Sequence, residues 1–323
     1  MVISTKSIVE GALLVLISVI MYLLGIYNIA LGFISALLCP VPIILLVLRH
    51  DVKVIFSGFF ISILILLTLA GLIEAQTFVL EFLLPGYVMG YFIKKDNSPE
   101  KVIFMTSIIY VINTLIFMVI TSKILEKDIL GDIVRSIEVS FDGFMKLYKE
   151  NGIDAAKIAI LQQQKDFIIE LFKHTYPAFF VCVSFITMTV NYKIVAKIAG
   201  RVGHYIKEID ISRIRIPEYF IWAFILACII KYINITLKMP EFIFIERIAE
   251  NIIFILLASY FIQGISIAVI YMKKWRFPSF FIIINMIMFI LLSPLQFIPL
   301  FLGIFDFWFD FRKRLINIGQ KQA

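Results

Sequence analysis

Charged side chains that stand inside long apolar runs are the residues of this sequence most able to do chemistry. Glu81 lies in TFVLEFLLPGYVMGYF, Lys231 lies in IWAFILACIIKYINI, and Asp306 and Asp310 lie in the closing run. A charge within a membrane span is unfavourable unless it is paired or hydrated, so each such residue is a functional candidate. We therefore examine these three places first.

Glu81 is followed by Pro85, Gly86 and Gly90. A proline frees a backbone carbonyl one turn back, and glycines allow helices to approach closely or to unwind. The pattern indicates a helix break beside a carboxylate. Two interpretations stay open: tight helix packing alone, or a binding pocket that faces the outside.

Lys231 lies about two turns from the expected outer end of its span. Its apolar neighbours are numerous enough to carry one lysine into the bilayer. Snorkelling toward the head groups, an internal ion pair and contact with an anionic ligand all remain open.

Asn113, with Asn191, Gln263 and Asn285, is expected to hydrogen-bond between helices. Glu81, Asn113 and Lys231 are the candidate ligand-binding residues.

Asp306 and Asp310 are four residues apart and share one helix face, where two carboxylates repel unless cations oppose them. Asp310 has Lys313 and Arg314 three and four residues further on. Asp306 has no such local partner. Its expected partners are basic residues elsewhere in the chain: Lys273, Arg276 or the segment 193–216. We interpret the pair as a charge-paired anchor, because the context is GIFD and lacks the G-x-G-D of two-aspartate intramembrane proteases.

Other residue types give no sign of a reaction. The three cysteines lie in apolar runs without a C-x-x-C pair or metal-ligand spacing, and the three histidines lie in different segments. H-E-x-x-H, G-x-S-x-G and the nucleotide-binding G-x-x-x-x-G-K-[ST] do not occur. We therefore predict no enzyme, no cofactor and no metal site.

The composition places the chain in a membrane. Of its 323 residues, 61% are hydrophobic and only 16% are charged, and the mean hydropathy is +0.99. Soluble domains are less apolar and more highly charged. The net charge of +7 comes from short basic clusters between apolar runs, which is typical of cytoplasmic loops near anionic lipid. Nucleic acid is therefore not an expected partner, whereas the lipid bilayer is.

Apolar runs long enough to cross the hydrocarbon core recur along the chain. They lie near 8–27, 29–48, 54–73, 77–93, 102–122, 175–194, 218–237, 250–272 and 277–311. The last run is too long for one straight span. Pro294 and Pro299 predict a turn at 295–298, which gives a tight hairpin. The fold class is thus all-α, a polytopic membrane protein with about 9–10 transmembrane helices.

The charge of the connections predicts the topology. The segment 193–216 has six basic residues against two acidic ones, whereas the insert 123–173 has eight basic and nine acidic. Basic connections alternate with neutral or acidic ones, which places both termini in the cytoplasm and the insert outside. We expect a six-span bundle over 1–194, a cytoplasmic loop at 195–217, a bundle of three to four spans over 218–314 and a cytoplasmic tail at 315–323.

The insert shows apolar residues at three- and four-residue steps from Ile129 to Tyr148. This spacing predicts an amphipathic helix, a break at Asn151 and Gly152, and a second helix from about Asp154. A structural cap and a lid over an external cavity both remain open.

Two passages, CPVPIILLVLRHDVK from Cys39 and LGIFDFWFDFRKR from Leu302, resemble the YybS-like family of uncharacterised bacterial membrane proteins. The resemblance extends over nearly the whole chain. It implies a multi-spanning protein of the bacterial plasma membrane and transfers no catalytic residue.

The first six spans are also distantly similar to the substrate-binding subunits of energy-coupling-factor transporters. Those subunits hold a vitamin or metal in a pocket open to the outside and depend on separate coupling ATPase subunits. The first span here, EGALLVLISVIMYLLG, lacks the family's alanine-x-x-x-alanine contact.

Two main hypotheses for function follow. The first is binding or transport of a small solute through a pocket open to the outside. The second is a non-transporting membrane scaffold or regulatory partner that acts through the insert or the basic loops. The five-plus-five division of spans around the insert also permits inverted repeats, but matching broken helices are absent from the sequence.

Overall fold

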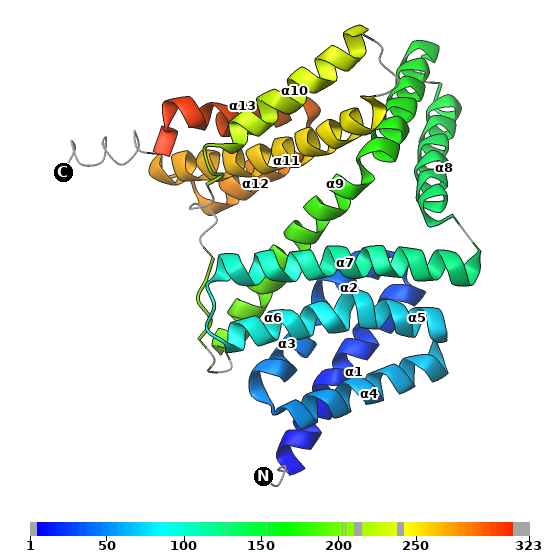
Figure 1. Cartoon of the computed structure of the whole chain (residues 1–323), viewed down its shortest axis with the longest axis vertical. Coiled ribbons are helices and arrows are strands. Elements are labelled where there is room, and N and C mark those ends of the chain that lie inside the picture. Colours follow the sequence, from blue (N-terminus) through cyan, green and yellow to red (C-terminus); the bar gives the residue numbers. More distant parts are fainter. Residues whose placement is uncertain are drawn as a thin grey trace, which may run out of the picture. The chain divides into compact units, whose positions relative to one another are not determined.

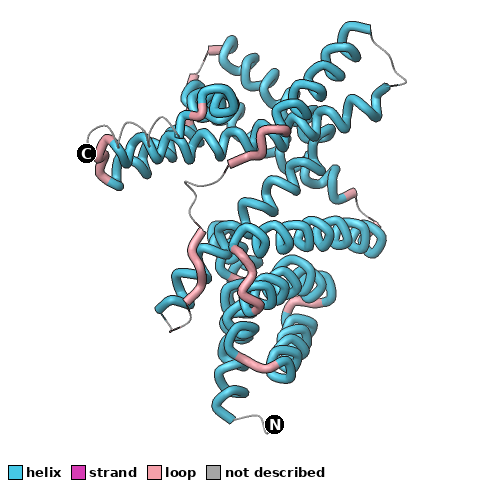
Figure 2. Tube along the Cα trace, turned by 60° about the vertical axis from the view of Figure 1, so that its left-hand side comes forward, coloured by secondary structure: helices cyan, strands magenta, loops and turns pink. Residues whose placement is uncertain are grey.

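The computed structural model describes residues 5–126, 128–152, 154–201, 203, 205–209, 215–237 and 242–312. Every regular element within these residues is a helix, and short loops join the helices (Figure 1, Figure 2). The all-α class predicted from the sequence is confirmed. The chain forms two compact units: unit 1 comprises Met1–Lys165 and Val183–Ile209, and unit 2 comprises Asp166–Cys182 and Asp210–Ala323. The domain boundaries expected from the sequence stay a prediction.

Unit 1 contains the first nine elements of the chain. They are α1 (Thr5–Tyr27), α2 (Ile29–Leu38), α3 (Pro40–Arg49), α4 (Val52–Leu69), α5 (Leu72–Thr77), the π-helix η1 (Phe78–Leu83), α6 (Leu84–Lys94), α7 (Pro99–Leu125) and α8 (Ile129–Glu150). Helix α1 packs against α2, α3 and α4, and α6 packs against α3 and α7. Tyr22, Leu46 and Phe78 are among the buried side chains of this core.

Helix α9 (Ala155–Arg201) has 47 residues, which corresponds to about 70 Å at 1.5 Å per residue. The expected first amphipathic helix is α8, and Gly152, with a φ of 69°, follows its end as predicted. The expected second helix continues without a break into the next apolar run. Residues 166–182 of α9 belong to unit 2, and the remainder belongs to unit 1.

Unit 2 is built around α11. It contains α10 (Phe220–Leu237), α11 (Ile243–Lys274), α12 (Ser279–Leu291) and α13 (Ser293–Phe309). Helix α11 packs against α10, α12 and α13 (Figure 1).

Two glycines allow α11 and α13 to touch backbone to backbone. A Cβ atom added at Gly264 would lie 1.6 Å from the Pro299 carbonyl oxygen, and one added at Gly303 would lie 1.8 Å from the Tyr260 carbonyl oxygen. In a bilayer the hydrophobic effect does not drive helices together. Small residues at a crossing let the two backbones approach closely, and the van der Waals contact between them stabilises the pair. Unit 2 therefore depends on this crossing.

Seven helices in the described residues are long and apolar enough to cross a membrane, or eight if the bent pair α12 and α13 counts as one span. Each apolar run expected from the sequence is helical. The run 29–48 is divided at Cys39 into α2 and α3, because Pro40 and Pro42 begin a new helix. The protein is thus a multi-pass membrane protein, and its orientation stays a prediction.

The closing run is broken, but not where the prolines were expected to break it. The chain bends by 101° between α12 and α13, at Leu292, so one straight span is excluded. Residues 295–298, predicted as the turn, lie inside α13. That prediction is wrong because Pro294 lies in the first turn of α13, where a helix needs no N–H donor, and so begins a helix.

Candidate functional site

Glu81 lies in η1, at the place where the sequence predicted a helix break. In a π-helix each backbone N–H donates to the carbonyl oxygen five residues earlier in the chain. The donor to the Leu80 carbonyl would therefore be the N–H of residue 85. That residue is Pro85, which has no N–H. Asn113 of α7 takes its place, and its Nδ2 donates to the Leu80 carbonyl oxygen at 2.9 Å. The break is a widened turn within a continuous helix, and Asn113 completes its hydrogen bonding.

The Glu81 carboxylate has neutral neighbours. The hydroxyl of Thr114 donates to Oε2 at 3.3 Å, and the hydroxyl of Tyr110 lies nearby. Oε1 is buried and has no hydrogen-bond partner among the residues described. Glu81 and Asn113 thus lie close together in unit 1, since Asn113 bonds to the backbone of Leu80, and Glu81 has no paired cation in the described part of the chain.

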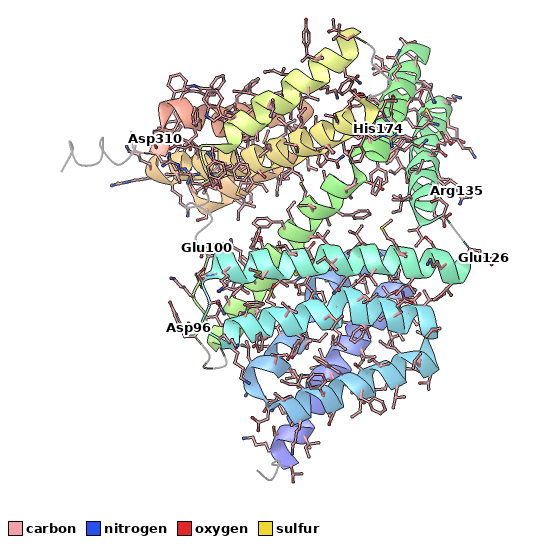
Figure 3. The ribbon with its side chains drawn as sticks, in the orientation of Figure 1. Asp96, Glu100, Glu126, Arg135, His174 and Asp310 are labelled. Carbon is pink, nitrogen blue, oxygen red and sulfur yellow. The ribbon has the colours of Figure 1, made fainter. Side chains whose placement is uncertain are left out.

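Lys231 belongs to unit 2 and forms an ion pair there. Its Nζ lies 3.0 Å from Oε1 of Glu250, and Nδ1 of His174 lies 3.2 Å from Oε2 of the same carboxylate. Helices α9, α10 and α11 each contribute one residue to this charged cluster of His174, Lys231 and Glu250. Figure 3 labels His174 on α9, close to the first turns of α11. Of the three roles left open for Lys231, the internal ion pair is present.

The side chain of Asn251, the neighbour of Glu250, forms hydrogen bonds with two backbone groups of α9. The Ala178 N–H donates to its Oδ1 at 3.0 Å, and its Nδ2 donates to the His174 carbonyl oxygen at 2.9 Å. In an uninterrupted α-helix these two backbone groups would bond to each other. Pro177 lies between them within α9. A side chain inserted at a proline is a recognised cause of an opened helical ladder, and here it holds His174 beside Glu250.

A cavity of 590 Å³ lies next to the charged cluster, entirely within unit 2. Its polar lining consists of Lys231, Glu250, Thr175 and Gln296. Its apolar lining comes mainly from phenylalanine and leucine: Phe167, Leu171, Phe254, Leu257, Phe261, Phe297 and Leu300. Small-molecule sites have volumes of about 300–1,000 Å³, mostly apolar walls and a few polar groups. This cavity has each of these properties.

Asp306 is buried between α11 and α13, with 2% of its surface exposed. Gln263 donates through Nε2 to its Oδ2 at 3.0 Å, and the Phe311 N–H donates to its Oδ1 at 2.9 Å. Among the described residues, Arg312 forms an ion pair with Asp306, and the Arg312 Nε lies 3.8 Å from Oδ2. Asp306 therefore fastens the end of α13 to α11.

Asp310 ends α13 in Figure 3 and lies 3.7 Å from an Arg215 guanidinium nitrogen. The sequence predicted Lys273, Arg276 or the segment 193–216 as the partner of Asp306; Arg215 of that segment instead lies near Asp310. Lys313 and Arg314, the predicted local partners, lie outside the described residues. Both aspartates thus have a cation, which agrees with the interpretation as an anchor.

The other intramembrane amides differ in their roles. Gln263 bonds between helices, as expected, whereas Asn285 donates to the Phe281 carbonyl of its own helix at 2.9 Å. The Asn191 amide is fully buried and has no hydrogen-bond partner in the part of the chain that the structure describes. No group of three or more His, Cys, Asp or Glu within the described ranges has the arrangement of a metal site.

The sequence did not single out Glu250, His174 or Asn251. The apolar run was expected to begin near 250, at the edge of the membrane, whereas α11 begins at Ile243, so Glu250 lies about two turns inside the helix. One signal was present: Glu246 and Glu250 share a helix face, as do Lys231 and Asn234 on α10, and Asn234 donates to Glu246. Such paired polar faces at the ends of two consecutive apolar runs indicate an interhelical polar contact.

Residues 16–307 match the family described as "Predicted membrane protein (DUF2232)", which is more than half of the chain. The chain belongs to this family. It is also 23% identical over 316 residues to the "Uncharacterized protein YybS" of Bacillus subtilis (strain 168), which covers 96% of this chain and 99% of that protein. The predicted resemblance to YybS-like proteins is confirmed. No solved structure matches the chain. The likeness to energy-coupling-factor subunits stays a prediction.

Proposed function

We propose that this DUF2232 protein binds a small amphipathic solute in the cavity of unit 2. The observation that supports the proposal is the cavity itself, which has apolar walls and a charged edge formed by Lys231 and Glu250. An amphipathic molecule would gain from burial of its apolar part against the phenylalanines and from polar contacts at that edge.

The predicted topology gives the cavity an orientation. Lys231 lies near the outer end of α10, and Glu250 lies near the outer end of α11, if the basic connections face the cytoplasm. The solute would then enter from the outside of the bacterial plasma membrane, with the charged cluster nearest the outer head groups. Under this proposal Glu81 and Asn113 stabilise unit 1 and do not touch the solute.

A pair of tryptophan variants on α11 tests the proposal. Ala258 lines the cavity, whereas Ile252 lies on the same helix, is 37% exposed and does not line it. We expect the purified protein to carry a small molecule that solvent extraction and mass spectrometry detect. Ala258→Trp should lose this molecule because the indole fills the cavity, and Ile252→Trp should retain it. An unoccupied wild-type protein, or equal occupancy in both variants, would contradict the proposal.

A second candidate function is a scaffold or regulatory partner that acts through the external insert. The observation that favours it is the uncovered apolar surface of α8, where Val139, Phe144 and Leu147 are exposed by 71%, 58% and 53%. Membrane partner proteins, including coupling ATPase subunits, belong to this proposal. A photo-crosslinker placed at Phe144 in cells tests it: one specific protein captured in stoichiometric amount, together with an unoccupied cavity, would favour this function over solute binding.

A further inference from the structure

We infer that the solute is an acid, with an apolar chain and a carboxylate or phosphate head group that Lys231 binds. This inference rests on the proposed function, because it names the ligand class of the same cavity. It follows from three observations: which charge at the cavity edge is accessible, which hydrogen-bonding capacity is already used, and what the cavity walls are made of.

The accessible charge at the edge of the cavity is positive. The side chain of Glu250 is only 12% exposed, whereas that of Lys231 is 40% exposed. Both line the cavity. A head group that enters the cavity therefore meets the ammonium group before the carboxylate.

Each oxygen of the Glu250 carboxylate already has one hydrogen-bond partner. Lys231 lies 3.0 Å from Oε1 of Glu250, and His174 lies 3.2 Å from Oε2. An ammonium group has three N–H donors, and the contact with Glu250 uses one of them. The more exposed ammonium thus has two further donors for a ligand, whereas the less exposed carboxylate already has one partner on each oxygen, so a ligand that supplies acceptor oxygens complements the ammonium.

An oxyanion fits this arrangement better than the other common head groups. A hydrogen bond from an ammonium to an anionic oxygen is roughly twice as strong as one between neutral groups, so an alcohol would bind less tightly. An amine head group would be protonated, would repel Lys231 and would find Glu250 already paired. The accessible ammonium group of Lys231 therefore selects against cations and in favour of acids.

The cavity walls require an apolar chain behind the head group. Phe167, Phe254, Phe261 and Phe297 line it together with Leu171 and Leu257. A fully polar anion such as inorganic phosphate would leave these walls uncovered. A single-chain acid and a phospholipid anion share the required chemistry, and the experiment below distinguishes them.

The test measures binding to the full-length protein in nanodiscs of neutral phosphatidylcholine. The probes are oleate, oleyl alcohol, oleylamine and dioleoyl phosphatidate, each in competition with radiolabelled oleate. We expect oleate to bind about tenfold more tightly than the alcohol, since a charge-assisted hydrogen bond is lost, and still more tightly than the amine. Phosphatidate that competes more strongly than oleate would assign the site to a membrane lipid, and a weaker effect would assign it to a single-chain acid.

Variants locate the preference at Lys231. The single change Lys231→Met leaves Glu250 without its cation and risks misfolding, so the main variant is the double change Lys231→Met with Glu250→Gln, which removes both charges. It should bind oleate about tenfold more weakly and oleyl alcohol within about twofold of the wild type. Lys231→Arg should keep the preference, and Lys123→Met, at an exposed lysine in the last turn of α7, should change nothing.

Three outcomes would overturn the inference, and they are distinguishable. Equal affinity of the wild type for oleate, alcohol and amine would refute the acid class while solute binding itself stands. Failure of every probe to bind would refute the proposed function as well. An unchanged preference in the double variant would also refute the role of Lys231.

Discussion

Each unit has a proline that interrupts a helix near a carboxylate, and in each an asparagine from a neighbouring helix supplies the lost hydrogen bonding. In unit 1, Asn113 donates to the Leu80 carbonyl that Pro85 leaves without a donor. In unit 2, the amide of Asn251 both donates and accepts where Pro177 interrupts α9. The two arrangements are similar because the bilayer core contains no water that could hydrogen-bond to backbone N–H and C=O groups left without partners at a proline.

The surroundings of the two carboxylates are different. In the part of the chain that the structure describes, the polar neighbours of the Glu81 carboxylate are hydroxyl groups, and one of its oxygens lacks a hydrogen-bond partner. Glu250 is paired with Lys231 and His174, and it lines a cavity of 590 Å³. A buried carboxylate at an irregular helix is therefore not sufficient to indicate a binding site. A charge that stays accessible beside an open volume is the feature that separates unit 2 from unit 1.

The largest difference between the units is expected at glycines that lie against a neighbouring helix. Gly303→Ala should destabilise unit 2 by about 3 kcal/mol, because the added methyl group would meet the Tyr260 backbone, which cannot move without displacing α11. Gly86→Ala in unit 1 should cost about 1 kcal/mol, because its methyl group meets the side chain of Ile43, which can rotate. Thermal unfolding in detergent measures both. Equal destabilisation would contradict the assignment of the closer backbone contact to Gly303 in unit 2.

The two asparagines should differ next. Asn251→Ala leaves the Ala178 N–H and the His174 carbonyl without partners, and we expect it to destabilise the protein by about 2 kcal/mol. Asn113→Ala removes one hydrogen bond and should cost about 0.6 kcal/mol. The same unfolding measurement compares them. If Asn113→Ala destabilised the protein as much as Asn251→Ala, the two asparagines would be equally important for stability, and the predicted difference between them would be wrong.

The smallest stability difference is expected for the carboxylates themselves. Glu250→Gln removes the anion of Lys231 and should destabilise unit 2 by about 1 kcal/mol, a value reduced from that of a fully buried pair because Lys231 is partly exposed. Glu81→Gln keeps the size and polarity of a side chain that has no paired cation, and we expect a change below about 0.5 kcal/mol. Solute occupancy should change only for Glu250→Gln, because Glu250 lines the cavity beside Lys231, and mass spectrometry of the purified variants checks this.

Sequence reasoning reached the individual elements more readily than their contacts. The apolar runs predicted the helices, the break after Glu150 was correctly placed, and Lys231 was found because a lysine in an apolar run needs a partner. The partner itself was missed. Glu250 lies 19 residues away on another helix, and His174 lies 76 residues from Glu250. Helical periodicity shows which side of a helix a residue occupies, but not which helix lies opposite.

Prolines were the other source of error, because their effect depends on position in the helix. Pro294 and Pro299 were both interpreted as turn residues, whereas Pro294 begins α13 and Pro299 lies inside it. Pro299 is accommodated because Gly264 leaves room for its carbonyl. Only the neighbouring helix provides that information.

The most direct test of solute binding in unit 2 is photoaffinity labelling of the full-length protein in membranes. A diazirine-bearing fatty acid is activated by light, and the labelled peptides are identified by mass spectrometry. Solute binding in unit 2 predicts label between Ile253 and Phe261 of α11 and at Phe297 or Leu300 of α13, and excess unlabelled oleate should abolish it. Competable label around Glu81 and Asn113 with none in these segments would contradict it.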